Sequence, residues 1–134
     1  MSQSKYFEDG GWERVQAPLR AVDPILETFA NANGLVVSHN DRGWPSRSIV
    51  WYRDDVRCLI QLYLASEEAI TFDLWLCASQ DRGKDRYWIK ETLLKDKPVE
   101  AFASQLPFLL ESGREKLVEW SMAPEAMEYA VTTN

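Results

Sequence analysis

The chain has 134 residues, two cysteines and a formal net charge of −6. This length suits a domain that folds on its own hydrophobic core without disulfides or metal, so we expect one domain over residues 1–134. The negative charge repels a phosphate backbone, which argues against nucleic acid as a partner, and the apolar runs are too short to span a bilayer, which argues against a membrane partner. The start of the chain lacks the apolar segment of a secretory signal and carries acidic residues, so we expect a cytoplasmic protein.

The first expected element is a helix between Pro18 and Asn33, because apolar residues recur there at helical spacing. The sequence NANG at its end is typical of a helix C-cap. Pro24 complicates the helix start, since proline is costly in a helix interior. One alternative therefore begins the regular helix with Asp23 as the N-cap and Pro24 at the first helical position.

Five β-rich segments follow Gly34 and are separated by turn-forming clusters. They are LVVSH, SIVWYR, VRCLIQLYLA, AITFDLWLCA and RYWIKETLL, at residues 35–39, 48–53, 56–65, 69–78 and 86–94. The short connections between them favour an antiparallel meander over a parallel sheet.

The third and fourth segments have apolar residues at their even positions, which predicts that these residues share one buried face. With ASEEA as the hairpin loop, the predicted pairs are Leu64 with Ile70, Leu62 with Phe72, Ile60 with Leu74 and Cys58 with Leu76. On the other face the same register places Leu59 opposite Trp75 and Gln61 opposite Asp73.

Helical spacing returns after Lys97 and predicts a long C-terminal helix. The residues that carry this spacing are Val99, Phe102, Leu106, Leu109 or Leu110, Gly113, Leu117 and Trp120. Pro107 should kink the helix or divide it near Gln105. The two ends of the chain, about residues 1–16 and 122–134, are expected to be extended or frayed.

These elements predict an α+β fold with two layers. A mainly antiparallel sheet of about five strands forms one layer as a meander. The N-terminal helix and the long C-terminal helix form the other, packed on the even-position face of the sheet.

No residues assemble into a recognisable catalytic or metal-binding set, so we expect no cofactor and no metal. His39 is the only histidine, which excludes a zinc site with two histidine ligands, and Cys58 and Cys77 lack CxxC spacing. The predicted register puts the two cysteines on opposite faces, which excludes a disulfide between them. Both lie within strands, which argues against a Cys–His nucleophilic pair.

The stretch HNDRGWPSR, residues 39–47, contains turn-forming residues and is interpreted as a hairpin loop, not as a catalytic loop. A hairpin does not require Trp44 at its tip. A large ring there either folds back onto the domain or docks into a partner, and we favour the first.

The face opposite the predicted core mixes aromatic, aliphatic and charged groups. The candidate binding residues are Trp75, Tyr63, Arg57, Asp73 and Leu59, together with Trp44 of the loop. Trp, Tyr and Arg are the residue types that anchor protein interfaces. The alternative is that the chain itself covers this face, either with its N-terminal segment, which contains Tyr6, Phe7 and Trp12, or with the loop that carries Trp44.

Two functional hypotheses follow. The first is a non-catalytic protein-binding module of the adaptor, chaperone or toxin-neutralising type, whose partner is another protein or a second copy of the chain. The second is a small-molecule-binding protein or enzyme, with a pocket between the sheet and the C-terminal helix near Pro107 that is lined by Trp51, Trp88 or Trp120.

Overall fold

The computed structural model describes residues 11–129 and has the predicted α+β class. Its strands form one antiparallel sheet in sequence order, so the meander is confirmed, with six strands instead of five. The strands are β1 Val37–Asn40, β2 Ser46–Arg53, β3 Val56–Ser66, β4 Thr71–Arg82, β5 Asp85–Lys97 and β6 Glu128–Tyr129. The helices are α2 Gly11–Ala32, α3 Val99–Phe102, α4 Leu106–Ser121 and the short 3-10 helix η1 Pro124–Ala126.

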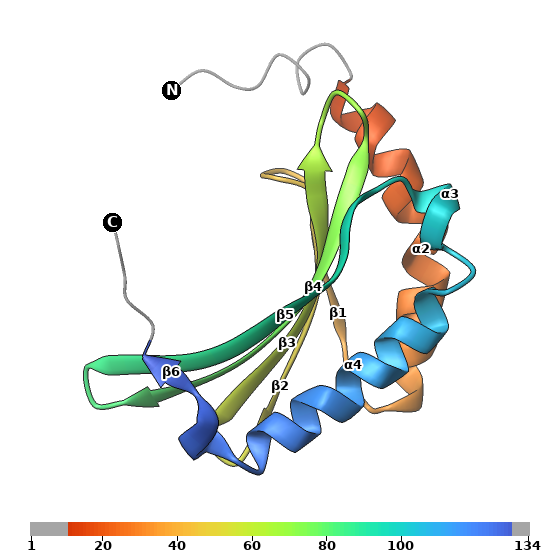
Figure 1. Ribbon diagram of the computed structural model, residues 1–134. Coiled ribbons are helices and arrows are strands. Elements are labelled where there is room, and N and C mark those ends of the chain that lie inside the picture. Colours follow the sequence, from red (N-terminus) through yellow and green to blue (C-terminus); the bar gives the residue numbers. More distant parts are fainter. Residues whose placement is uncertain (1–10, 130–134) are drawn as a thin grey trace.

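The helices cover one face of the sheet, as the two-layer prediction requires (Figure 1). Helix α4 packs on β3, β4 and β5, and α2 packs on β1, β2 and α4. The long strands bend away from the helices, so the sheet is concave on its opposite face (Figure 1). We call this opposite surface the helix-free face.

Helix α2 begins at Gly11 and continues through both Pro18 and Pro24, so the predicted start at Pro18 or Asp23 was wrong. Asp23 is not an N-cap, and residues 11–16 are helical instead of extended. Each interior proline removes one helical hydrogen bond. Burial of the apolar stripe that begins at Val15 and runs to Ala30 offsets this loss, since hydrophobic contact with the core outweighs local propensity.

The hairpin of β3 and β4 keeps the predicted core face, but the predicted register was wrong by two residues. Leu64 pairs with Phe72 instead of Ile70. Ile70 has a φ of 55°, which is incompatible with a strand, and a bulge follows Leu64. The turn comprises residues 67–70 and is closed by the pair of Ser66 with Thr71, so it lies further along the chain than ASEEA. The shift by an even number leaves every side chain on its predicted face.

On the helix-free face the shift changes each cross-strand neighbour. Leu59 lies opposite Cys77, and Trp75 lies opposite Gln61. Tyr63 lies opposite Asp73. The predicted pairs of Leu59 with Trp75 and of Gln61 with Asp73 were therefore wrong.

Pro107 lies in the first turn of α4, so the C-terminal helical region is divided into α3 and α4 and is not one long helix. Because N–H groups in the first turn have no partner within the helix, proline costs no hydrogen bond at this position. Gly113 then lets α4 approach β4 closely, because a Cβ atom there would lie 2.8 Å from Cδ2 of Leu76. Part of the tail that was expected to fray is ordered, since Tyr129 of β6 pairs with Tyr87 of β5.

The core lies between the sheet and the helices and contains the even positions of β3 and β4, with Phe72 and Leu62 fully buried. Cys58 belongs to this core, whereas Cys77 lies on the helix-free face, and both are free thiols, as predicted. Among residues 11–129, no helix combines the length and the apolar character needed to cross a membrane.

Candidate functional site

The helix-free face carries five of the six predicted binding residues, and they lie on the neighbouring strands β3 and β4. Tyr63 and Asp73 form one cross-strand pair, and Trp75 follows on the next row beside Gln61. Leu59 occupies the row after that and is only 7% exposed. Arg57 lies further along β3, opposite Tyr52 of β2.

Hydrogen bonds fix the aromatic groups of this face. Trp75 Nε1 donates to Gln61 Oε1 at 2.9 Å, and Gln61 Nε2 donates to Ser48 Oγ at 3.0 Å. The Tyr63 hydroxyl donates to Asp73 Oδ2 at 3.0 Å, and the rings of Tyr63 and Trp75 meet edge to face at 6.5 Å. These contacts hold the rings in defined orientations while both remain partly exposed.

Asp73 is 7% exposed and both of its carboxylate oxygens accept hydrogen bonds. The second donor is the backbone N–H of Asp96, at 2.7 Å. Burial raises the pKa of the Tyr63 hydroxyl, and the hydrogen bond to Asp73 raises it further. Tyr63 therefore stays neutral and donates to the carboxylate.

Trp44, at the tip of the β1–β2 loop, folds back onto the domain as predicted, because its Nε1 donates to the backbone oxygen of Leu64 at 2.6 Å. The side of the ring remains accessible, with 46% of the residue exposed. Beside it lies a hollow of about 270 Å³ on the helix-free face. Its lining residues are Asn40, Trp44, Ser46, Gln61, Tyr63 and Trp75.

Strand β5 adds Trp88 and Lys90, which the sequence prediction did not include in the site. Lys90 Nζ lies 4.7 Å from the ring centre of Trp88 and 5.8 Å from that of Trp75. Gly83 in the sequence could have indicated the two-residue turn between β4 and β5. In the structure Gly83 has a φ of +67°, and this turn fixes the register of the two strands. That register places Lys90 opposite Cys77.

Cys77 lies among cationic side chains at the centre of this face. Burial raises the pKa of the Cys77 thiol, while Arg57, Lys90 and Arg86 oppose the increase. Arg86 forms an ion pair with Asp81 at 2.8 Å. Arg57 and Lys90 have no carboxylate partner among the described residues.

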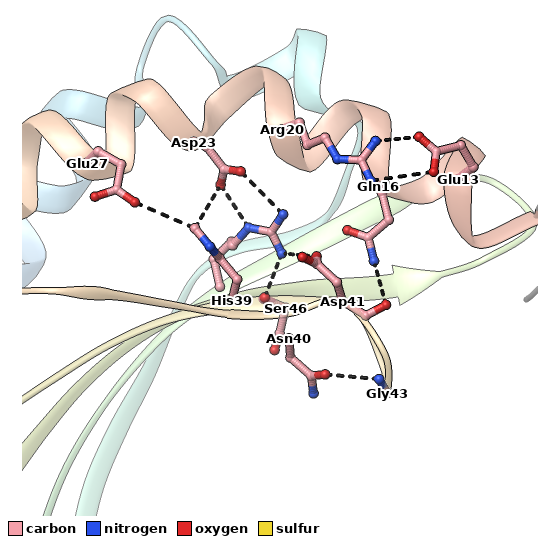
Figure 2. Close-up of polar contacts among 11 residues, drawn as sticks. Glu13, Gln16, Arg20, Asp23, Glu27, His39, Asn40, Asp41, Gly43 and Ser46 are labelled. Carbon is pink, nitrogen blue, oxygen red and sulfur yellow. Dashed lines mark hydrogen bonds and ion pairs between the residues drawn. The ribbon is translucent and has the colours of Figure 1, made fainter.

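A second polar cluster joins α2 to the β1–β2 hairpin (Figure 2). Arg47 is 2% exposed, and its Nε donates to Asp23 Oδ1 at 2.8 Å while its Nη1 donates to Asp41 Oδ1 at 2.9 Å. His39 Nε2 lies 3.7 Å from Asp23 Oδ1 and 3.6 Å from Glu27 Oε2. His39 therefore faces carboxylates and not a hydroxyl or thiol, which fits a structural role for this cluster.

The loop at residues 39–47 forms the predicted hairpin, since His39 pairs with Arg47 across β1 and β2. Gly43 N–H donates to Asn40 Oδ1 at 3.0 Å, a turn contact of the kind that asparagine supplies. Across residues 11–129, no group of three His, Cys, Asp or Glu side chains could hold a metal ion.

An apolar groove of about 390 Å³ lies beside Pro107, but between α2 and α4 and not between the sheet and α4. It is lined by Pro24, Ile25, Thr28, Phe29, Ala32, Pro107 and Glu111. Trp51, Trp88 and Trp120 do not line it, so this groove is not the predicted pocket. It forms because α2 extends far enough to lie beside the start of α4.

Comparison of the chain with models of protein families, with curated proteins and with solved structures finds no match. The N-terminal residues Tyr6 and Phe7 lie outside the described part of the chain, as does the side chain of Trp12.

Proposed function

We propose that the protein is a non-catalytic protein-binding module of the adaptor, chaperone or toxin-neutralising type. Its binding surface is the helix-free face, and its partner is another protein or a second copy of the chain. The observation that supports this most directly is the set of rings around Trp75. They are fixed by hydrogen bonds yet partly exposed, on a hollowed face that no described helix covers.

Such an arrangement suits binding because an interface anchor must be large, rigid and accessible. Trp75 and Tyr63 lose little conformational freedom when a partner docks, since their hydrogen bonds already restrict them. Leu59 and Cys77 form a largely buried apolar base beneath the rings, and Arg57 and Lys90 supply charge beside it. A purely solvated sheet face does not need any of these groups.

The test compares Trp75→Ala with Phe108→Ala. Phe108 is an aromatic residue on α4 that is 73% exposed, so it matches the size of the truncation at a distant place. Each variant is immobilised to capture a partner protein from a cell lysate. Its self-association is measured separately by light scattering. We expect Trp75→Ala to weaken association by about thirtyfold or more, as for an interface anchor, and Phe108→Ala to leave it unchanged.

Thermal unfolding of both variants completes the test. Trp75→Ala removes a hydrogen bond and a ring contact, so a modest fall in Tm is expected. A large fall in Tm with unchanged association would mean that Trp75 serves only the fold. Deletion of residues 1–10 tests the alternative cover, since their removal should then increase association through this face.

The groove between α2 and α4 supports a second candidate function, the binding of a small apolar molecule. Its volume lies in the range of ligand pockets, and Ile25, Phe29 and Pro107 give it an apolar wall. A panel of apolar small molecules should raise the Tm, because a ligand that binds only the folded state stabilises it. Thr28→Trp should fill the groove and abolish that increase.

A further inference from the structure

We propose that the helix-free face binds an acidic segment of another protein. A carboxylate of that segment lies between Arg57 and Lys90, and a neighbouring apolar or aromatic side chain enters the hollow beside Trp44 and Trp75. This inference rests on the proposed function and adds the chemistry of the partner to it.

The charge distribution is the first reason. The chain has a formal net charge of −6, yet Arg57 and Lys90 on the helix-free face have no carboxylate partner among the described residues. Asp81 pairs with Arg86, and Asp73 is buried and accepts its two hydrogen bonds from neutral donors, so the one carboxylate of Asp73 stands against the two cations Arg57 and Lys90. The free charge at the centre of this face is therefore positive.

The second reason is that the two cations lie on the strands that flank β4. Arg57 and Lys90 belong to β3 and β5, and Cys77 of β4 lies between these strands. Lys90 lies opposite Cys77, and Arg57 lies opposite Ser79, two residues along β4 from Cys77, so the two cations flank β4 at this spot. Both also oppose the effect of burial on the Cys77 pKa. A carboxylate at this spot can accept charge-assisted hydrogen bonds from both, which are stronger than neutral ones.

The third reason is the hollow beside this spot. Trp75 lines the hollow of about 270 Å³ and its ring is also 5.8 Å from Lys90 Nζ. One side chain of a partner can therefore fill the hollow while a nearby acidic residue reaches the cations. The rings that line the hollow favour an apolar or aromatic occupant.

A second copy of the chain fits this face less well. Asp73 of this face is buried and already accepts two hydrogen bonds, so each copy would offer Glu128 of β6, opposite Trp88, to the two cations of the other copy. Two copies placed face to face would leave cations buried without partners, which is costly. A nucleic acid is disfavoured because the net charge of −6 repels its backbone.

The experiment uses a fluorescent random copolymer of glutamate and tyrosine as the probe, with binding measured by anisotropy. A lysine–tyrosine copolymer and a single-stranded DNA oligonucleotide serve as comparison ligands. The test variant is Arg57→Glu with Lys90→Glu. The control variant is Arg14→Glu with Lys84→Glu, which changes the net charge equally at two exposed cations away from this face.

We expect the glutamate–tyrosine copolymer to bind, the lysine–tyrosine copolymer not to bind, and added salt to weaken the complex. The test variant should lose about tenfold or more in affinity, the effect of one or more charge-assisted hydrogen bonds, and the control variant less than about threefold. If the charge reversal unfolds the protein, Arg57→Gln with Lys90→Gln replaces it with the same expectation.

Several results would overturn the inference. These are absence of copolymer binding, equal losses in the test and control variants, tighter binding of DNA through the same cations, or a dimer that the test variant dissociates. The proposed function is judged separately. If Trp75→Ala abolishes association with a protein partner while the charge variants leave it unchanged, the binding module stands and the acidic partner does not.

Discussion

The ion pair of Asp23 with Arg47 should be a strong contributor to stability, and Asp23→Ala tests this. Arg47 is 2% exposed and donates to both oxygens of Asp23, at 2.8 and 3.3 Å. Hydrogen bonds to charged groups contribute about 1.5–3 kcal/mol, and the guanidinium keeps its bonds to Asp41 and to the backbone of Ser46. Loss of the Arg47 bonds to Asp23 in Asp23→Ala should therefore lower the free energy of unfolding by about 2–3 kcal/mol. Alanine favours the helix, which reduces this effect by about 0.5 kcal/mol.

The expected net effect of Asp23→Ala is about 2 kcal/mol, or a fall in Tm of about 7 °C for a domain of this size. Urea unfolding followed by circular dichroism measures it. The control is Glu13→Ala on the same helix, which removes the exposed ion pair with Arg20 and should leave the unfolding midpoint unchanged. Equal midpoints for the two variants would refute the reasoning that burial of Arg47 gives its ion pair a larger effect.

Four further predictions concern the core, the loop and the two thiols. Leu62→Ala should destabilise by about 2–5 kcal/mol in urea unfolding, and Tyr52→Ala, at an exposed position of β2, by no more than about 0.5 kcal/mol; the reverse order would contradict the assignment of the two sheet faces. His39→Ala should leave partner or copolymer binding unchanged by anisotropy, and a loss of binding with the fold intact would give the loop a functional role. Burial raises the pKa of Cys58 from 9.0 to about 11, so stability should fall as pH rises from about 9 to 11, where the unfolded chain loses the proton that the folded protein keeps; Cys58→Ala should reduce this fall, and a pH profile identical to wild type would contradict it. Burial also raises the Cys77 pKa, so native Cys77 should react slowly with a thiol reagent at pH 8, and a fast reaction would contradict its burial.

The two faces of the β3–β4 hairpin could be predicted because burial acts on alternate residues over long strands. This signal survives an error in register of two residues, which is why Leu62 and Trp75 were placed on the correct faces although every predicted pair was wrong. The register itself depends on the turn, and nothing in the sequence indicates that Ile70 adopts a φ of 55°. Local preference for a strand placed Ile70 in the fourth strand instead of in the turn.

Two parts of the molecule could not be predicted because they depend on contacts between distant residues. The extension of α2 through Pro18 and Pro24 depends on packing against the sheet, and local propensity opposes it. Strand β6 has two residues and exists because it pairs with β5. The burial of Arg47 is of the same kind, since its carboxylate partners come from α2 and from the loop.

The two polar clusters of the protein differ in a way that bears on function. In the cluster of α2 and the β1–β2 hairpin, the buried cation Arg47 is matched by the carboxylates of Asp23 and Asp41, so its charge is balanced within the domain. On the helix-free face, Lys90 lies beside the rings of Trp75 and Trp88, and neither Lys90 nor Arg57 forms an ion pair with a described carboxylate. Two cations on one face without a carboxylate partner do not stabilise the isolated domain, because like charges repel each other. A partner that supplies the missing carboxylate turns this cost into binding free energy, and for this reason the helix-free face is the better candidate for recognition.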